Sequence, residues 1–150
     1  MSLKLMLFVS LSICRADVAD FVDLQKYDFS IKMELAGDKA RCLLRKGVAQ
    51  ALSRVQSTLQ LQGVGLRVLV CYRPPSVQAK AFDQEASHTT GAAVDVTLLD
   101  VKDLRSTKKK RIRLEKAMKA EGFIPIRRVP FHFEYKDKYP SEEIDVEKFP

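Results

Sequence analysis

The segment Gly91-Ala-Ala-Val-Asp-Val-Thr-Leu98 lies past the middle of the chain and alternates apolar side chains with smaller or polar ones. This alternation predicts a β-strand, because successive side chains of a strand point to opposite faces. One face of the predicted strand is apolar and is formed by Val94, Val96 and Leu98. The other face is mixed and is formed by Ala93, Asp95 and Thr97. A carboxylate inside such a strand needs a partner, since a buried unpaired charge is costly. Asp95 is therefore the first candidate functional residue.

The segments on either side of this strand predict an α+β domain. Apolar residues at helical spacing predict a helix over 39–62, with Asp38 as its N-cap and Gly63 just past its end. The remaining predicted elements are a strand over 65–71, a short helix over 76–82, a second helix from 105 to near 122, and a hairpin of 123–126 with 131–135. This order indicates a single domain with a small antiparallel sheet packed with helices.

The composition is that of one globular domain. The chain has 150 residues, of which 46% are hydrophobic and 30% are charged, so it can bury a core without cross-links. Its 26 Lys and Arg exceed its 19 Asp and Glu, which gives a net charge of +7. A basic balance suits several anionic partners and does not choose among them.

The cysteine pattern excludes two kinds of site. The chain contains Cys14, Cys42 and Cys71 and no CxxC pair, which excludes a zinc ribbon and a thioredoxin-like redox site. Cys42 and Cys71 could pair in an oxidising compartment. We expect two buried free thiols instead, because a domain of this size does not need the cross-link.

The first residues have the pattern of a short secretory signal. Lys4 precedes an apolar stretch over 5–13, and Ala16 stands at a possible cleavage site. The stretch is too short to span a bilayer, and no other segment is long and apolar enough to be transmembrane. We therefore expect residues 1–16 to be a signal peptide and 17–150 to be an exported domain of the periplasm or cell envelope. The alternative is a cytoplasmic protein whose N-terminus is a buried element.

His88 and His132 are the only histidines of the chain, and they lie in a polar loop over 86–90 and on a predicted strand, respectively. His88 precedes Asp95 by seven residues, and His132 stands between two phenylalanines. Taken singly, each of the three is more simply explained as a hydrogen-bonded core residue. Taken together, two imidazoles and a carboxylate can hold Zn²⁺ with a fourth position open for chemistry. The three residues therefore predict a site for one zinc ion per chain.

The sequence around these residues resembles the zinc D-alanyl-D-alanine dipeptidases, the family that includes those of vancomycin resistance. His88-Thr-Thr-Gly-Ala-Ala-Val-Asp95 matches the family motif H-x-x-G-x-A-x-D. Other family landmarks follow in the family's order: Phe21-Val-Asp-Leu24, Ala40-Arg-Cys-Leu-Leu-Arg45, Val70-Cys-Tyr-Arg-Pro74, Gly122-Phe-Ile-Pro125 and His132-Phe-Glu-Tyr135. The resemblance covers about residues 21–140.

The resemblance implies a metallo-dipeptidase that hydrolyses D-Ala-D-Ala or a related peptidoglycan peptide in cell-wall metabolism. It implies His88, Asp95 and His132 as the zinc ligands. It also implies that Arg73 stabilises the oxyanion of the reaction, a role that suits a permanently charged group with a fixed fork of donors.

Some family positions differ in this chain. The family's catalytic glutamate, three residues before the second histidine, is Val129 here, and valine cannot accept a proton. Glu134 lies two residues past His132 on the same predicted strand face, so it is either a substitute base or only a neighbouring acid. The carboxylate that grips the substrate amine has no counterpart by motif, and Asp100 and Asp103 are candidates for it.

These departures leave two hypotheses for the function. The first is a zinc dipeptidase with impaired activity. The alternative is a catalytically inactive relative that binds zinc and peptidoglycan peptides, favoured by Val129, Val70 and Ala86 in place of family residues. The basic run over 105–113 has six cations in nine residues. The simplest interpretation is a solvated surface, and the alternative is a contact with an anionic polymer. No aromatic residue interrupts this run, so we expect no nucleic-acid partner.

Overall fold

The structure, a computed structural model, describes residues 18–26, 34–35, 41–80, 86–100 and 108–150. The expected signal peptide over 1–16, the expected N-cap Asp38 and the candidate Asp103 lie outside these residues. Within the described part, no helix is long and apolar enough to cross a membrane.

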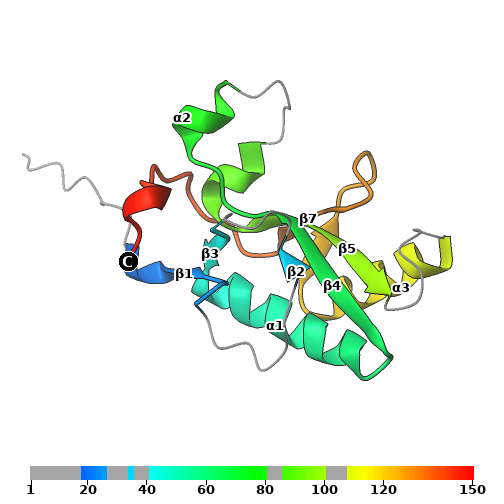
Figure 1. The fold of residues 1–150 in the computed structure, drawn as a ribbon. Helices are drawn as coiled ribbons and strands as arrows, with labels where there is room; N and C mark the ends of the chain where they lie inside the picture. Colours follow the sequence, from blue (N-terminus) through cyan, green and yellow to red (C-terminus); the bar gives the residue numbers. More distant parts are fainter. Residues whose placement is uncertain (1–17, 27–33, 36–40, 81–85, 101–107) are drawn as a thin grey trace, which may run out of the picture.

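A five-stranded sheet in the order β2-β4-β5-β7-β6 forms the centre of the domain (Figure 1). Its strands in this order are Glu34–Leu35, Val64–Val70, Ala93–Asp100, His132–Tyr135 and Phe123–Pro125. The expected antiparallel pairing holds for three of the four neighbouring pairs, including the predicted hairpin of β6 with β7. The edge strand β2 is parallel to β4 and was not expected, since two residues carry no readable alternation. The predicted α+β class and single domain are confirmed.

The two faces of the sheet are covered by different elements. Helices α1 (Lys46–Gln60) and α3 (Lys108–Ala120) lie along one face, where they pack on Val94 and Val96 of β5 in the main apolar core (Figure 1). The short helices α2 (Pro75–Gln78) and η2 (Ala86–Thr90) lie on the other side of the sheet. The mixed face of β5, with Asp95, is turned toward η2.

Helix α1 begins seven residues later than the sequence indicates. Residues Leu43–Arg45 form strand β3, which pairs antiparallel with β1 (Phe21–Asp23). Leu43 and Leu44 are buried in this strand, which explains why these positions are apolar although they are not in a helix. The backbone of Arg45 is extended, with φ −56° and ψ 139°, and marks the boundary.

The end of α1 and the start of the next strand agree better with the sequence. The helix ends at Gln60, and Gly63 then turns the chain into β4 with φ +73°, a conformation that glycine adopts without strain. The expected short helix over 76–82 is observed in part, because α2 covers Pro75–Gln78 and residues 79–80 form a turn, whereas 81–82 lie outside the described residues. The second expected helix is α3.

The expectation of free thiols is wrong, because Cys42 and Cys71 form a disulfide with a Cα–Cα distance of 5.2 Å. The backbone explains the pairing. The Tyr72 amide donates a hydrogen bond to the Leu43 carbonyl at 3.0 Å, so the start of β3 runs beside the residues that follow β4. This adjacency brings together two cysteines that are 29 positions apart in sequence.

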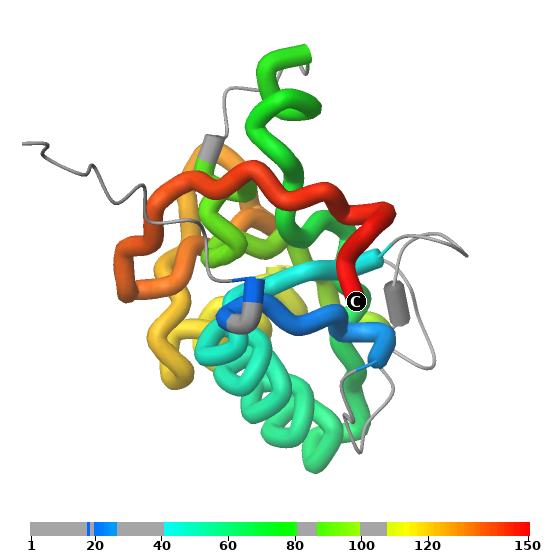
Figure 2. The backbone as a smooth tube through the Cα atoms, turned by 90° about the vertical axis from the view of Figure 1, so that its left-hand side faces the viewer, coloured from blue at the N-terminus to red at the C-terminus, as the bar shows by residue number. Residues whose placement is uncertain are grey.

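The C-terminal residues 140–149 cross the domain and contain only the short turn η3 (Val146–Lys148) (Figure 2). Hydrogen bonds and ion pairs nevertheless hold them to the rest of the domain. The Tyr72 hydroxyl donates to the Glu142 carbonyl at 2.7 Å and accepts from the Ile144 amide at 2.8 Å. The buried guanidinium of Arg45 pairs with Glu142 at 3.5 Å and with Asp20, in the N-terminal turn η1 (Val18–Asp20), at 3.1 Å. Arg45 therefore ties both ends of the described chain to the β3–α1 junction.

Candidate metal centre

The three predicted metal ligands lie together on the sheet face opposite α1. Asp95 on β5 stands directly opposite His132 on β7 in the antiparallel register, so their side chains are neighbours on one face. His88 reaches them from η2, which lies over this face. The turn after η2 requires Gly91, which has φ +70° and packs so closely on the Phe21 ring that a Cβ would overlap it.

Asp95 is the centre of this cluster. Its Oδ1 lies 2.7 Å from Nδ1 of His132 and 3.3 Å from Nε2 of His88. The two imidazole rings meet edge to face with their centroids 4.9 Å apart. One ligand atom from each residue can be chosen so that all three lie within 4.8 Å of one another. The cluster can therefore hold a metal ion.

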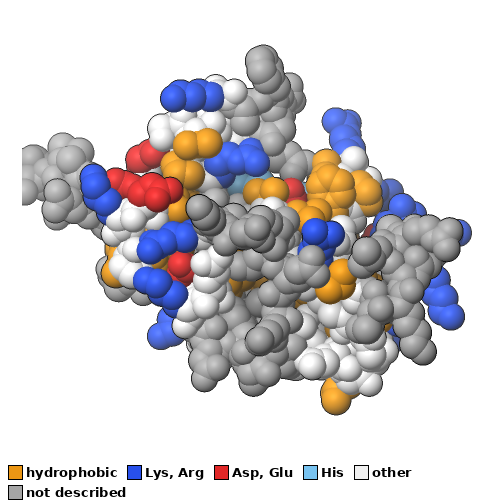
Figure 3. Space-filling view, viewed as in Figure 1, with side chains coloured by type: hydrophobic (Ala, Val, Ile, Leu, Met, Phe, Trp, Pro, Cys, Tyr) orange, Lys and Arg blue, Asp and Glu red, His pale blue; other side chains and the backbone are white. Residues whose placement is uncertain are grey.

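The cluster is buried but close to the surface. The exposed fractions of His88, Asp95 and His132 are 2%, 8% and 1%. A small area of histidine surface is visible beside basic side chains on the face shown in Figure 3. An ion held by these residues would be shielded by protein on most sides.

The charge state of Asp95 suits it to bind a cation. Burial would raise the pKa of this carboxyl, but hydrogen bonds from His132 and His88 and their charges outweigh burial and lower the pKa to about 2. The group is therefore ionised at neutral pH. One carboxylate and two imidazoles form a donor set that fits zinc. To bind an ion here, the ring nitrogens of the two histidines that face Asp95 would have to be unprotonated.

The other ring nitrogen of each histidine has a different environment. Nε2 of His132, on the ring edge away from the Asp95 contact, lies 3.1 Å from Oγ of Ser87 and 3.7 Å from Oε1 of Glu134. Nδ1 of His88 is buried and has no hydrogen-bond partner among the described residues. The His88 proton therefore belongs on Nε2, where Asp95 accepts it. The contact of Ser87 was not predicted, and its only sequence signal is its position next to His88.

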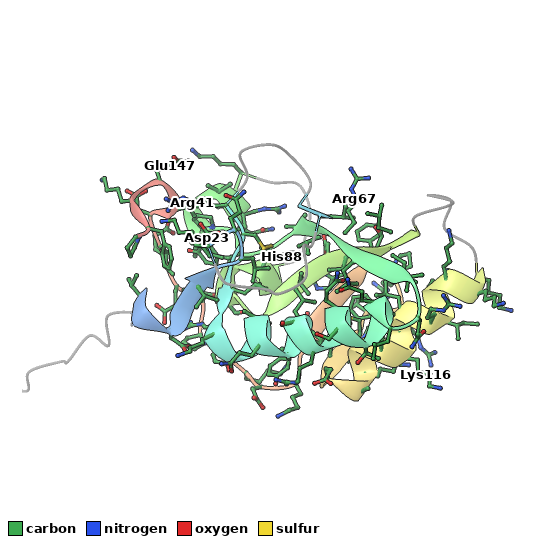
Figure 4. All side chains as sticks on the ribbon, turned by 60° about the horizontal axis from the view of Figure 1, so that its bottom comes forward. Asp23, Arg41, Arg67, His88, Lys116 and Glu147 are labelled. Atoms are coloured by element: carbon green, nitrogen blue, oxygen red, sulfur yellow. A yellow bond between two sulfur atoms is a disulfide. The ribbon has the colours of Figure 1, made fainter. Side chains whose placement is uncertain are left out.

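The backbone of Arg73 contacts the cluster at His88, but its side chain contacts Gln78 instead. Its amide donates to the His88 carbonyl at 3.2 Å, and its guanidinium donates to Oε1 of Gln78 at 3.0 Å. The side chain lines an open groove of about 810 Å³ with Arg41 and residues 143–147. Figure 4 shows Arg41 close to Glu147 and Asp23, some way from His88. None of the three clustered residues is among the described residues lining this groove.

The structure also places two positions where the chain departs from the family pattern. Val129 lies in the turn between β6 and β7, half-buried, and its carbonyl accepts the His132 amide at 3.0 Å. Asp100 stands at the far end of β5, opposite Val64. It is five positions along the strand from Asp95, so the backbone of Asp100 lies about 16 Å from that of Asp95.

A curated protein resembles part of this chain in sequence. No protein-family model matches the chain. The D-alanyl-D-alanine dipeptidase of Escherichia coli (strain K12) is 34% identical over an alignment of 74 residues, which covers 41% of this chain and 38% of that protein. The match thus spans well under half of that relative's length.

Two solved structures share the fold. A variant of the vancomycin-resistance D,D-pentapeptidase VanY from a VanB-type cassette, in complex with Zn(II), has a TM-score of 0.51 and 14% identity over 73% of this chain and 81% of its own. The LD-carboxypeptidase LdcB has a TM-score of 0.55 and 20% identity over 80% of this chain and 69% of its own. The sequence match confirms the resemblance to the D-alanyl-D-alanine dipeptidases, and the two solved structures show a shared fold.

Proposed function

We propose that this protein binds one zinc ion through His88, Asp95 and His132 and hydrolyses D-Ala-D-Ala or a related peptidoglycan peptide, at a reduced rate. The observation that carries the proposal is the convergence of Nε2 of His88 and Nδ1 of His132 on Oδ1 of Asp95. When bound there, zinc would supply Lewis-acid activation of a peptide carbonyl and of a water molecule.

Glu134 acts on His132 rather than on the substrate in this proposal. The two nitrogens of an imidazole lie on different edges of the ring, and Glu134 contacts the edge that does not face Asp95. Histidines that bind metals commonly give their other N–H to a carboxylate, which fixes the ring orientation and its tautomer. Glu134 and Ser87 would hold His132 in this way, which argues against Glu134 as a substitute base.

Arg73 supplies positive charge to a bound peptide in this proposal. Its guanidinium rests on the neutral side chain of Gln78, and its backbone is anchored to the cluster through His88. If the Arg73 side chain rotated away from Gln78, its guanidinium could donate hydrogen bonds to a carboxylate or to a developing oxyanion of the peptide.

A second candidate function is zinc and peptide binding without turnover. Val129 favours it, because the position at which the family pattern has a glutamate holds a side chain that cannot move a proton. General acid–base catalysis is typically worth about 10²–10⁴-fold in rate. Loss of that factor leaves either a slow enzyme or a binding protein.

An exported location also belongs to the proposal, with residues 1–16 as a signal and 17–150 as the working domain. The Cys42–Cys71 disulfide supports it, because disulfides persist in oxidising compartments and are rare in the cytosol. The envelope is also where a peptidoglycan peptide would be met.

The test is amine release from D-Ala-D-Ala by protein reconstituted with one equivalent of zinc, with the metal-chelated protein and L-Ala-L-Ala as controls. We expect slow hydrolysis of the D,D-peptide that stops on chelation. Tight zinc and peptide binding in calorimetry without amine release would establish the second candidate. Failure to bind zinc would contradict both.

A further inference from the structure

The positive charge of the protein is concentrated in one stretch of the chain. Residues 108–131, from α3 through the turn between β6 and β7, contain nine of the 26 Lys and Arg but only two of the 19 Asp and Glu. The other parts of the chain hold 17 cations and 17 acids. The whole net charge of +7 therefore lies in this stretch.

The cations of this stretch are mostly available at the surface. Seven of the nine are exposed, and the other two are half-buried. Its two acids are already engaged, since Glu115 pairs with Lys119 at 3.6 Å and Glu121 pairs with Arg54 of α1 at 2.6 Å. The field of this surface is therefore strongly positive.

An apolar cavity lies within the same surface. It has a volume of about 260 Å³ and is lined by Val96, Thr97, Leu98, Lys110, Arg111, Leu114, Pro130 and Phe131. The turn is fixed there, because the Val96 amide donates to the Phe131 carbonyl at 2.9 Å. Phe131 remains 39% exposed at the cavity. Figure 3 shows basic side chains on the side of the molecule where α3 lies, beside apolar ones.

We propose that this surface, formed by α3 and the β6–β7 turn, docks the protein on an anionic lipid membrane. Cations beside a half-exposed aromatic ring and an apolar cavity match the headgroup and upper acyl region of an anionic bilayer. A soluble polyanion would engage only the cations and would leave Phe131 and the cavity unused. The proposal does not depend on zinc binding or on peptide hydrolysis.

The test is co-sedimentation with vesicles of phosphatidylglycerol and phosphatidylcholine, compared with vesicles of phosphatidylcholine alone, at 0.1 M salt. The variant combines Lys109→Gln, Arg111→Gln and Arg128→Gln. A matched control removes the same charge elsewhere, as Lys26→Gln, Lys80→Gln and Lys148→Gln, all at exposed positions. Each cation near an anionic surface changes partitioning roughly fivefold, so the first triple variant should bind about a hundredfold more weakly. The control should change binding only slightly.

A second pair of variants separates a membrane from a polyanion. Phe131→Ser should weaken vesicle binding severalfold and leave the binding of inorganic polyphosphate unchanged. Ile124→Ser, at an exposed position on strand β6, should change neither. Thermal unfolding of each variant confirms that it is folded before it is scored. Equal losses in the two triple variants, no binding of anionic vesicles by the parent protein, or no effect of Phe131→Ser would overturn the proposal.

Discussion

The metal cluster and the turn that leads into it adjoin in sequence but are built in different ways. Asp95 and His132 are placed by strand register and are buried. The turn over 126–131 is held by backbone hydrogen bonds such as the one from the Val129 amide to the Ile126 carbonyl, at 3.0 Å, and its side chains are half-buried or exposed. In the proposed function, the metal would be held by residues placed by the sheet, whereas Val129, at the position of the family's glutamate, lies in the turn. A substitution in the turn therefore need not disturb the cluster on the sheet.

The first prediction would break the cluster outright. His132→Ala should abolish zinc binding, because it removes one of three ligands and leaves Asp95 without its closest partner. The apo protein should also lose about 1–3 kcal/mol of stability, since Asp95 would be buried with one fewer hydrogen bond. Zinc content by mass spectrometry of the metal and urea unfolding measure the two effects. Asp137→Ala, an exposed position two residues past β7, is the control. Retained stoichiometric zinc would contradict the assigned ligands.

The second prediction concerns the turn and places the family's glutamate at position 129. Val129→Glu should raise hydrolysis of D-Ala-D-Ala by up to about 10²–10⁴-fold, the usual value of a general acid–base group. Zinc affinity should stay the same, because the turn does not hold the ion. Val129→Gln has nearly the same shape and cannot accept the proton, so steady-state rates of the two variants isolate the carboxylate. Equal rates for both would show that the turn does not present this position to the cluster.

The third prediction concerns the cross-link beside the cluster. Cys42→Ser should lower the free energy of unfolding by about 3–4 kcal/mol, because the disulfide closes a loop of 29 positions in the unfolded chain. The cluster itself should survive, since strand register rather than the disulfide places Asp95 and His132. Denaturant unfolding measures the first effect, and a zinc titration of the folded variant measures the second. Loss of zinc binding in the folded variant would show that the cluster depends on the cross-link.

The last prediction has the smallest effect and decides the role of Glu134. Glu134→Gln should weaken zinc binding about tenfold, because carboxylates behind metal-binding histidines typically contribute about 10–100-fold to affinity. Glu115→Gln on α3 is the control. If instead zinc affinity is unchanged and slow hydrolysis disappears, then Glu134 is the base and the positioning role is wrong.

Much of the fold could be predicted because its pattern is local. The alternation around Asp95, the turn at Gly63 and the hairpin of β6 with β7 depend on neighbouring residues and are observed. The start of α1 could not be predicted, since Leu43 and Leu44 satisfy a helical apolar pattern and a buried strand equally well. The disulfide and the parallel strand β2 depend on chain segments that meet only in three dimensions.

The candidate site divides in the same way. The proximity of His88, Asp95 and His132 follows from residue types and motif spacing. The sequence could not predict which ring nitrogen of His132 faces Glu134. Spacing along a strand tells which face of the sheet a side chain lies on, but not how a neighbouring imidazole is oriented. The position of the Arg73 guanidinium against Gln78 depends on a side-chain contact that no motif encodes.

The attachment of the C-terminal residues through Tyr72 and Arg45 has a consequence for the dynamics of the protein. Residues 140–149 contain no strand, yet their polar groups are bound to the β3–α1 junction and to the residues after β4. Such a segment cannot open by itself without leaving the buried guanidinium of Arg45 short of partners. Amide hydrogen exchange at Glu142 and Ile144 should therefore proceed only through the larger opening that also exposes Tyr72, as one cooperative unit with the central sheet.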